Sequence, residues 1–146
     1  MSLKIIAAAL LATALAAPAF AQADPIAARQ ALMKANGKDT KAGVGLLKGE
    51  VPFDAAAGQA IFARMNDVAG KFGNYFPKGS ETGGDTEAAP AIWTKPADFK
   101  TALVKFQTDT AAAMAAKPAT QAEFGKQFGA VTANCKSCHE AFRIKK

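Results

Sequence analysis

The sequence has few of the side chains on which most metal sites and many catalytic sites depend. Its 146 residues include one histidine and two cysteines. A structural zinc site needs four nitrogen, sulfur or oxygen ligands and is usually built from cysteine and histidine, so this chain is a poor candidate for one. The single histidine, His139, also excludes any site within the chain at which two imidazoles bind the same metal ion.

The long apolar run of the sequence stands at the N-terminus and is typical of a targeting segment. Lys4 precedes an apolar stretch from Ile5 to Ala17, and Ala19-Phe20-Ala21 has the small-x-small pattern of a cleavage site. The stretch has about 13 residues, fewer than the roughly 20 that span a bilayer. We therefore predict that residues 1–21 are a cleaved secretory signal peptide.

Cleavage is expected before Gln22, with cleavage after Ala23 as the alternative, and residues 22–146 are expected to form one domain. Such a protein would be exported to a bacterial periplasm. Without Lys4 the net charge falls from +6 to +5, and the basic residues are spread along the chain. A nucleic-acid-binding surface would show a denser basic stripe with interleaved aromatic residues, so no nucleic-acid partner is expected.

Both cysteines and the histidine occur together near the C-terminus, as Cys135-Lys136-Ser137-Cys138-His139. This C-x-x-C-H pattern is typical of covalent c-type haem attachment. Cys135 and Cys138 would share one helical face, so both sulfur atoms can form thioethers with the vinyl groups of one porphyrin. His139 is turned by about 100° and can bring its imidazole to the iron as an axial ligand. The motif therefore predicts one covalently attached haem c.

Two other uses of the cysteine pair are disfavoured by its surroundings. A thioredoxin-like redox pair needs a strand followed by a helix, and no alternating apolar pattern lies near the motif. A disulfide between cysteines three residues apart within a helix would strain the geometry of the bond. Haem attachment is the favoured interpretation, and a redox pair or a structural disulfide is the alternative.

The apolar spacing predicts helices and no strand. Asp24-Pro25 combines an N-cap with a proline at the first helical position. The helix that starts there would run from Ile26 to about Leu47 and end at Gly49. Asp54 is predicted to cap a second helix, whose apolar residues recur at helical spacing: Ile61, Met65, Val68 and Phe72.

A third helix is predicted to start around Pro96 and to end where Lys117-Pro118 interrupts the pattern. The segment between the second and third helices, from Gly73 to about Lys95, is rich in glycine, proline, threonine and charge. A loop of this length is unusual in a compact domain and is often functional. Trp93, the only tryptophan, is expected to anchor this loop by packing rather than to react.

A capping box, Thr120-Gln121-Ala122-Glu123, opens the fourth predicted helix. Its apolar seam includes both cysteines: Phe124, Phe128, Val131, Cys135, Cys138 and Phe142. A haem attached there would face the protein interior. Four amphipathic helices, joined by short links at the first and third connections, predict an all-α, antiparallel four-helix bundle with a long loop between the second and third helices.

The second axial position of the iron decides the function. A haem with one histidine ligand either stays five-coordinate and binds small gases, or is closed by a second ligand such as methionine, which raises the reduction potential and suits electron transfer. Residues 22–146 contain three methionines: Met33, Met65 and Met114. Met65 lies on the second helix's seam, and Met114 lies in an alanine-rich stretch. A helical methionine usually packs in a core, so the residues alone leave Met33 as a candidate only.

Several further segments accompany the C-terminal motif, which continues through Phe142 and Arg143. They are Arg29-Gln30, Leu47-Lys48-Gly49-Glu50-x-Pro52-Phe53-Asp54, Thr82-Gly83-Gly84-Asp85, and Ile92-Trp93 with Phe99. With them, essentially the whole of residues 22–146 resembles the class II c-type cytochromes, the group of cytochrome c′ and the low-spin cytochrome c-556 proteins. The late position of C-x-x-C-H is itself distinctive of this group.

The resemblance implies a left-twisted four-helix bundle with the haem near one end. In such proteins the residue one turn after the arginine of Arg-Gln faces the distal side of the iron. It is apolar in five-coordinate members and methionine in low-spin members, which implies Met33 and His139 as iron ligands here. The resemblance also places Arg29 near a haem propionate, with a solvated arginine as the alternative. Arg143 either contacts the proximal side of the haem or is solvated.

The favoured function is thus a periplasmic monohaem electron carrier, not an enzyme, that exchanges single electrons with redox partner proteins. Its mildly basic charge suits docking with an acidic partner. The alternative is a five-coordinate protein that binds nitric oxide or carbon monoxide. A peroxidase-like reaction would need distal acid–base groups, and the sole histidine is already used. No membrane span is expected, and the protein is expected to be a monomer or a homodimer.

Overall fold

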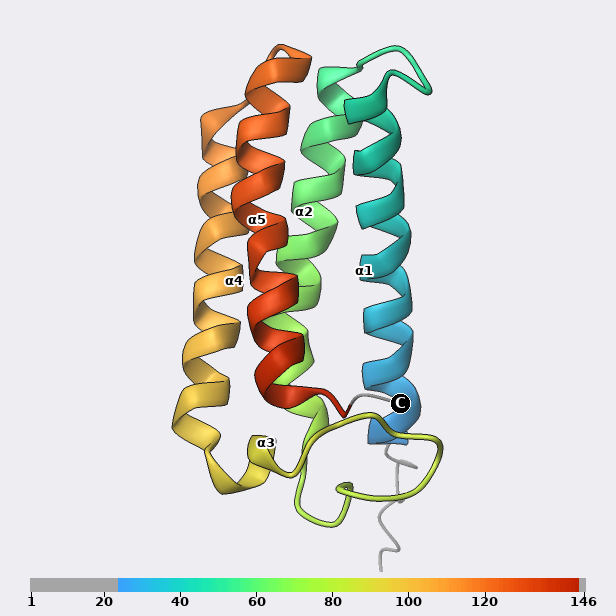
Figure 1. The fold of residues 1–146 in the computed structure, drawn as a ribbon, viewed down its shortest axis with the longest axis vertical. Coiled ribbons are helices and arrows are strands. Elements are labelled where there is room, and N and C mark those ends of the chain that lie inside the picture. The colour runs from blue at the N-terminus through green and yellow to red at the C-terminus, as the bar shows by residue number, and fades with distance from the viewer. Residues whose placement is uncertain (1–23, 145–146) are drawn as a thin grey trace, which may run out of the picture.

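The computed structural model of the chain describes residues 24–144, so the predicted signal peptide lies outside the described residues. Four long helices form the body of the protein: α1 (Pro25–Lys48), α2 (Ala55–Phe72), α4 (Pro96–Ala116) and α5 (Gln121–Phe142). Consecutive long helices run in opposite directions, and the long loop crosses one end of the bundle (Figure 1). The prediction of an all-α, antiparallel four-helix bundle is confirmed. Within residues 24–144, no helix has the length and apolar character needed to cross a membrane.

The helix ends follow the local signals of the sequence. The Asp24 carboxylate accepts a hydrogen bond from the backbone N–H of Ile26 at 2.9 Å, and Pro25 occupies the first turn of α1. Gly49 ends α1 with a φ of 67°, the left-handed conformation that favours glycine. At α5, Thr120 and Glu123 form both hydrogen bonds of the predicted capping box. These contacts involve residues close in sequence, which is why the pattern alone predicted them.

The main core lies in the half of the bundle away from the loop. Its largest fully buried side chains come from α2, α4 and α5: Phe62, Phe124, Met65, Val131 and Thr110. The rings of Phe62 and Phe124 lie 5.1 Å apart between centroids, and Phe124 stacks on Phe128. The apolar seams predicted for the second and fourth helices therefore face one another, and the interpretation of Met65 as a core residue is confirmed.

α1 and α5 touch closely at this same end of the bundle. A Cβ placed on Gly43 would lie 2.3 Å from Cε2 of Phe128, so the glycine lets the ring pack on the backbone of α1. A turn further on, the side-chain amide of Gln121 donates hydrogen bonds to the carbonyl oxygens of Leu46 and Leu47. Both contacts join the C-terminal part of α1 to the N-terminal part of α5. They fix the distance between the two helices at one end only.

The predicted long loop contains two short helical turns that the sequence analysis missed, η1 (Gly73–Tyr75) and α3 (Ala91–Thr94). Elements of one turn are too short to show a repeating apolar pattern. Trp93 lies on α3, where its indole N–H donates to the carbonyl of Phe76 at 3.2 Å and its ring packs edge-on against the Phe76 ring. The prediction that Trp93 anchors the loop is confirmed.

Arg29, near the start of α1, binds this loop from the inside. Its guanidinium donates to the carbonyl of Tyr75, to both oxygens of Ser80 and to the hydroxyl of Thr86, at 2.6–3.1 Å. The same group lies over the Phe76 ring, 4.8 Å from its centroid. Arg29 is 4% exposed. The guanidinium therefore holds together segments that would otherwise be joined only by loop backbone.

The loop also pairs with the end of α5. The backbone N–H of Ala89 donates to the carbonyl of Phe142, and the N–H of Ile144 donates to the carbonyl of Glu87. On the other side, the side-chain amide of Gln30 donates to the carbonyl of Gly84 at 3.0 Å. The loop thus links the N-terminus of α1 to the C-terminus of α5 (Figure 1).

The contact at Gly43 yields a test of helix packing. Replacing an interior helical glycine with alanine normally gains up to about 1 kcal/mol of helix propensity. At Gly43 the new methyl group would overlap the Phe128 ring, and overpacking costs about 1–3 kcal/mol. We expect Gly43→Ala to lower the free energy of unfolding, measured by urea denaturation of the haem-loaded protein. Gly129→Ala is the control because a Cβ there meets no atom within 4 Å; it should not destabilise. Equal effects of the two changes would contradict the packing argument.

The buried guanidinium yields a second test. Arg29→Lys keeps the charge but cannot make the forked set of hydrogen bonds, and it should lower the free energy of unfolding by about 2 kcal/mol. Hydrogen–deuterium exchange should also become faster at residues 80–86. The control is Arg64→Lys, because the Arg64 side chain is half exposed and pairs with Asp39 alone among the described residues. If both variants lose the same stability, Arg29 does not organise the loop.

Candidate haem site

A cavity of about 690 Å³ opens at the loop end of the bundle, among α1, α2, α4, α5 and the loop. Cofactor pockets typically measure about 300–1,000 Å³. Most of its wall is apolar, and aromatic rings contribute much of it: Phe72, Phe76, Phe99, Phe106 and Phe142. Phe76, Phe99 and Phe142 pack edge-on in a row, with centroids about 5 Å apart. The cavity can therefore take a large apolar group and shield much of it from water.

Cys135, Cys138 and His139 all line this cavity from α5. The two cysteines are half-buried on the seam that continues from Phe128 and Val131, as predicted. His139 lies on the cavity wall with much of its side chain exposed. The structure thus brings together the three residues of the motif on one wall of one cavity, and that cavity is large enough for a porphyrin.

The cysteines lack the lowered pKa that is typical of a redox pair. They are free in the structure. Burial raises the pKa of both thiols, and for Cys138 the neighbouring Cys135 adds a smaller upward effect. A reactive redox cysteine has a lowered pKa because the thiolate is the nucleophile. The helical context and the raised pKa values both disfavour a thioredoxin-like use.

His139 is set up to be neutral near pH 7. Desolvation at the cavity wall lowers its pKa, and the positive charge of Arg143 lowers it further, while Glu87 opposes them. A neutral imidazole has a lone pair for a metal, whereas the protonated form has none. The site therefore favours the form of His139 that can bind iron.

Met33 lines the same cavity from α1. Seven residues of this helix form that part of the wall: Arg29, Gln30, Met33, Lys34, Asn36, Gly37 and Thr40. With about 100° of rotation per residue, Met33 falls near the middle of this arc. The other two methionines of residues 24–144 pack with the main core instead, where Met65 is fully buried and Met114 is half-buried.

Arg29 lies at the cavity wall, but it is not the solvated arginine that one interpretation allowed. A guanidinium has five N–H groups, and the loop accepts hydrogen bonds from four of them. Burial lowers its pKa, and the carboxylates of Asp24 and Glu81 act in the opposite direction. The fifth N–H, at Nε, makes no hydrogen bond among residues 24–144. Sequence reasoning missed the loop contacts because their partners lie about 50 residues away in the chain.

Arg143 follows α5 and pairs with the loop. Its Nε lies 2.6 Å from a carboxylate oxygen of Glu87, and its side chain is half exposed. Both residues line the cavity beside His139. Arg143 is therefore an ion-paired residue at the cavity edge, which neither of the two sequence interpretations described.

The residues present fit a covalently attached haem. Two thiols and an imidazole lie on one wall, a thioether lies on another, and apolar rings line much of the rest of the cavity. Gly37, one turn after Met33, also lines the cavity, and a Cβ there would meet no atom within 4 Å. The absence of a side chain at this point leaves open space in the cavity beside Met33.

Comparisons with known proteins agree with the site. The family model described as Cytochrome C′ matches residues 24–143. The chain is 40% identical to cytochrome c-556 of Agrobacterium fabrum over all of this chain and 99% of the relative. It is 43% identical to cytochrome c′ of Rhodopseudomonas palustris over 88% of this chain and 87% of the relative. A solved structure of cytochrome c′ from Rhodopseudomonas palustris superposes with a TM-score of 0.81 at 41% identity, covering 86% of this chain and 99% of that one.

The match spans nearly all of the described residues and includes every segment on which the sequence resemblance rests. The relatives include proteins named cytochrome c-556 and proteins named cytochrome c′, so family membership alone leaves open whether the protein carries electrons or binds a ligand. The chain belongs to the cytochrome c′ family, and its cofactor is covalently attached haem c.

Proposed function

We propose that this protein is a periplasmic one-electron carrier whose haem iron is low-spin, with His139 and Met33 as its two axial ligands. The observation that carries the proposal is the position of Met33. It lies near the middle of the arc of α1 that lines the cavity of Cys135, Cys138 and His139. A thioether directed at an iron that already has one imidazole ligand is expected to bind it.

The haem supplies an iron that changes between the ferric and ferrous states. The chain's own residues do the rest. Cys135 and Cys138 would attach the haem to α5, the helix that also carries His139, so the haem and this imidazole would keep a fixed relative position. The lowered pKa of His139 keeps its imidazole neutral and able to bind. Met33, held on a rigid helix, offers a soft ligand that favours the ferrous state. Two ligands on packed helices limit rearrangement when an electron arrives or leaves.

A second function is favoured by a different observation. Gly37 leaves open space on the cavity wall one turn from Met33. If Met33 does not bind the iron, this space could admit a small gas such as nitric oxide or carbon monoxide, and the protein would be a five-coordinate gas binder. The two functions differ in one property that an absorption spectrum reads directly, the spin state of the iron.

Met33→Leu separates the two functions. The leucine has similar volume but no ligand atom, so we expect a low-spin wild type and a high-spin variant with a lower reduction potential and rapid carbon monoxide binding. Absorption spectroscopy and a redox titration measure these properties. The control is Met65→Leu, a similar exchange in the core outside the cavity, which should leave the spectrum unchanged. A wild-type protein that is already high-spin would contradict Met33 as ligand.

Export and attachment can be tested together. Intact-mass measurement of protein from the periplasm should give a chain that begins at Gln22 and carries one haem. A Cys135→Ala, Cys138→Ala double variant should be processed at the same bond but lose the haem on denaturation, because no thioether remains. A haem that stays bound to the denatured double variant would contradict the assignment of the two cysteines.

A further inference from the structure

Asn36 has a buried side chain for which the structure offers no partner. It lies on α1, three residues after Met33, and both residues line the haem cavity. Asn36 is only 8% exposed. Its amide oxygen is enclosed and has no hydrogen-bond partner. Apart from the backbone hydrogen bonds of the helix, one hydrogen bond to Asn36 is found among residues 24–144: its backbone carbonyl accepts from the Thr40 hydroxyl at 2.9 Å.

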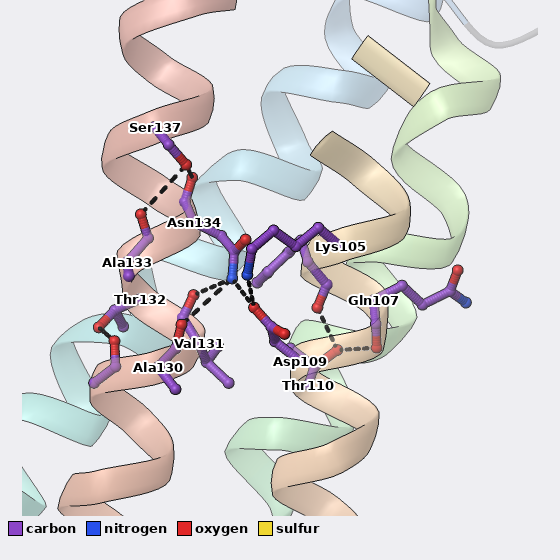
Figure 2. A network of polar contacts seen from close by, with 12 residues as sticks. Lys105, Gln107, Asp109, Thr110, Ala130, Val131, Thr132, Ala133, Asn134 and Ser137 are labelled. Atoms are coloured by element: carbon purple, nitrogen blue, oxygen red, sulfur yellow. Dashed lines mark hydrogen bonds and ion pairs between the residues drawn. The ribbon is translucent and has the colours of Figure 1, made fainter. Parts of the chain in front are cut away.

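Asn134 also lines this cavity and is buried, but its side chain has hydrogen-bond partners. Its side-chain nitrogen donates to the carboxylate of Asp109 at 2.7 Å and to the carbonyl of Val131 at 3.1 Å (Figure 2). Asp109 in turn binds Lys105, and these hydrogen bonds lower its pKa. This network ties α4 to α5. Asn36 has no comparable network, although it is buried to a similar extent.

The unpaired amide makes asparagine an unfavourable choice at this position. A buried polar group without a partner costs about 1–3 kcal/mol. Asparagine is also a weaker helix former than leucine, which has nearly the same shape and would suit an apolar wall. Rules of local stability are most often broken at functional sites, where the strain is offset by a bound group. A partner for the accessible NH2 end of the Asn36 amide is therefore expected inside the cavity.

We propose that Asn36 donates a side-chain N–H hydrogen bond to the atom or small ligand that occupies the iron on the Met33 side. Residues three apart on a helix lie on the same face, about 5–6 Å apart between Cβ atoms, so the amide and the Met33 thioether share one region of the cavity. The NH2 group makes no hydrogen bond among residues 24–144 and, unlike the oxygen, is not enclosed, so it is the end of the amide that a group in the cavity can reach.

The chemistry of iron ligands favours the donor end of the amide. Thioether sulfur, nitric oxide, carbon monoxide and cyanide all present lone pairs, and an anionic ligand adds negative charge. A donor stabilises these groups, whereas a carbonyl oxygen would repel them. The inference rests on the proposed function in one respect, that the Met33 side is the side of the iron opposite His139. It does not require Met33 itself to bind.

The test uses the haem-loaded protein with Met33→Ala, which opens the iron whether or not Met33 binds in the wild type. In this background, Asn36→Leu should weaken cyanide binding to the ferric protein about tenfold, the loss expected for one hydrogen bond worth about 1.4 kcal/mol. It should also move the C–O stretch of the ferrous carbon monoxide complex to higher frequency, because a nearby donor favours back-donation from iron. A purely structural residue would not change that frequency.

Two further variants complete the design. Asn36→Asp keeps the shape of the side chain and, as a carboxylate, has no donor, so it should also weaken cyanide binding, and it replaces the leucine variant if that one does not fold. Thr132→Val is the control, because Thr132 lies outside the cavity and its hydroxyl likewise donates to a backbone carbonyl one turn back, that of Phe128 at 2.8 Å; it should change cyanide affinity less than about twofold. Unchanged cyanide affinity and C–O stretch in both Asn36 variants would overturn the inference. A high-spin wild type would overturn Met33 ligation and leave this comparison intact.

Discussion

The ring of Phe128 lies against the backbone of α1 at Gly43, with no room for a side chain between them. This contact, with the hydrogen bonds from Gln121 a turn away, fixes how closely α1 and α5 approach at one end of the bundle. At the other end the same two helices are separated by the haem cavity. Close packing costs little where two helices meet over glycine, so the bundle can be tight at one end and open at the other.

At the open end, where α1 and α5 do not touch closely, the loop joins the two helices. The buried guanidinium of Arg29 donates hydrogen bonds to several residues between 75 and 86. The Trp93 ring packs against the Phe76 ring in the same part of the loop. The loop backbone then pairs with the end of α5 at Phe142. Burying a charge is costly unless hydrogen bonds compensate it, and the loop supplies four of them here. The cavity edge is therefore held by a polar cluster, and the opposite end of the bundle by apolar packing.

The polar and sulfur-containing side chains of the site come mainly from two helices that are far apart in sequence, α1 and α5. α5 carries the two thiols and the imidazole, whose relative positions are fixed by the short spacing of one motif. α1 carries Met33, Asn36 and Gly37, which line the cavity from another side. Proteins that share the motif can thus differ in what faces the free side of the iron. In this chain a thioether, a buried amide and an open space line the cavity from α1, and the proposals above depend on which of them meets the iron.

The sequence by itself determined the ends and the buried faces of the long helices, which depend on residues close in the chain, but not the one-turn elements η1 and α3. Asp24, Gly49 and the Thr120 capping box set helix ends through contacts within four residues, and the helical spacing of Cys135 and Cys138 placed both on one face. The apolar seams predicted the bundle because they leave each helix one face to bury. Met33 needed the family resemblance as well, since nothing in its own segment distinguishes it from a core methionine. Only the tertiary structure decided the partners of Arg29, the ion pair of Arg143 and the isolation of the Asn36 amide, because each depends on which distant groups come within about 3 Å of it.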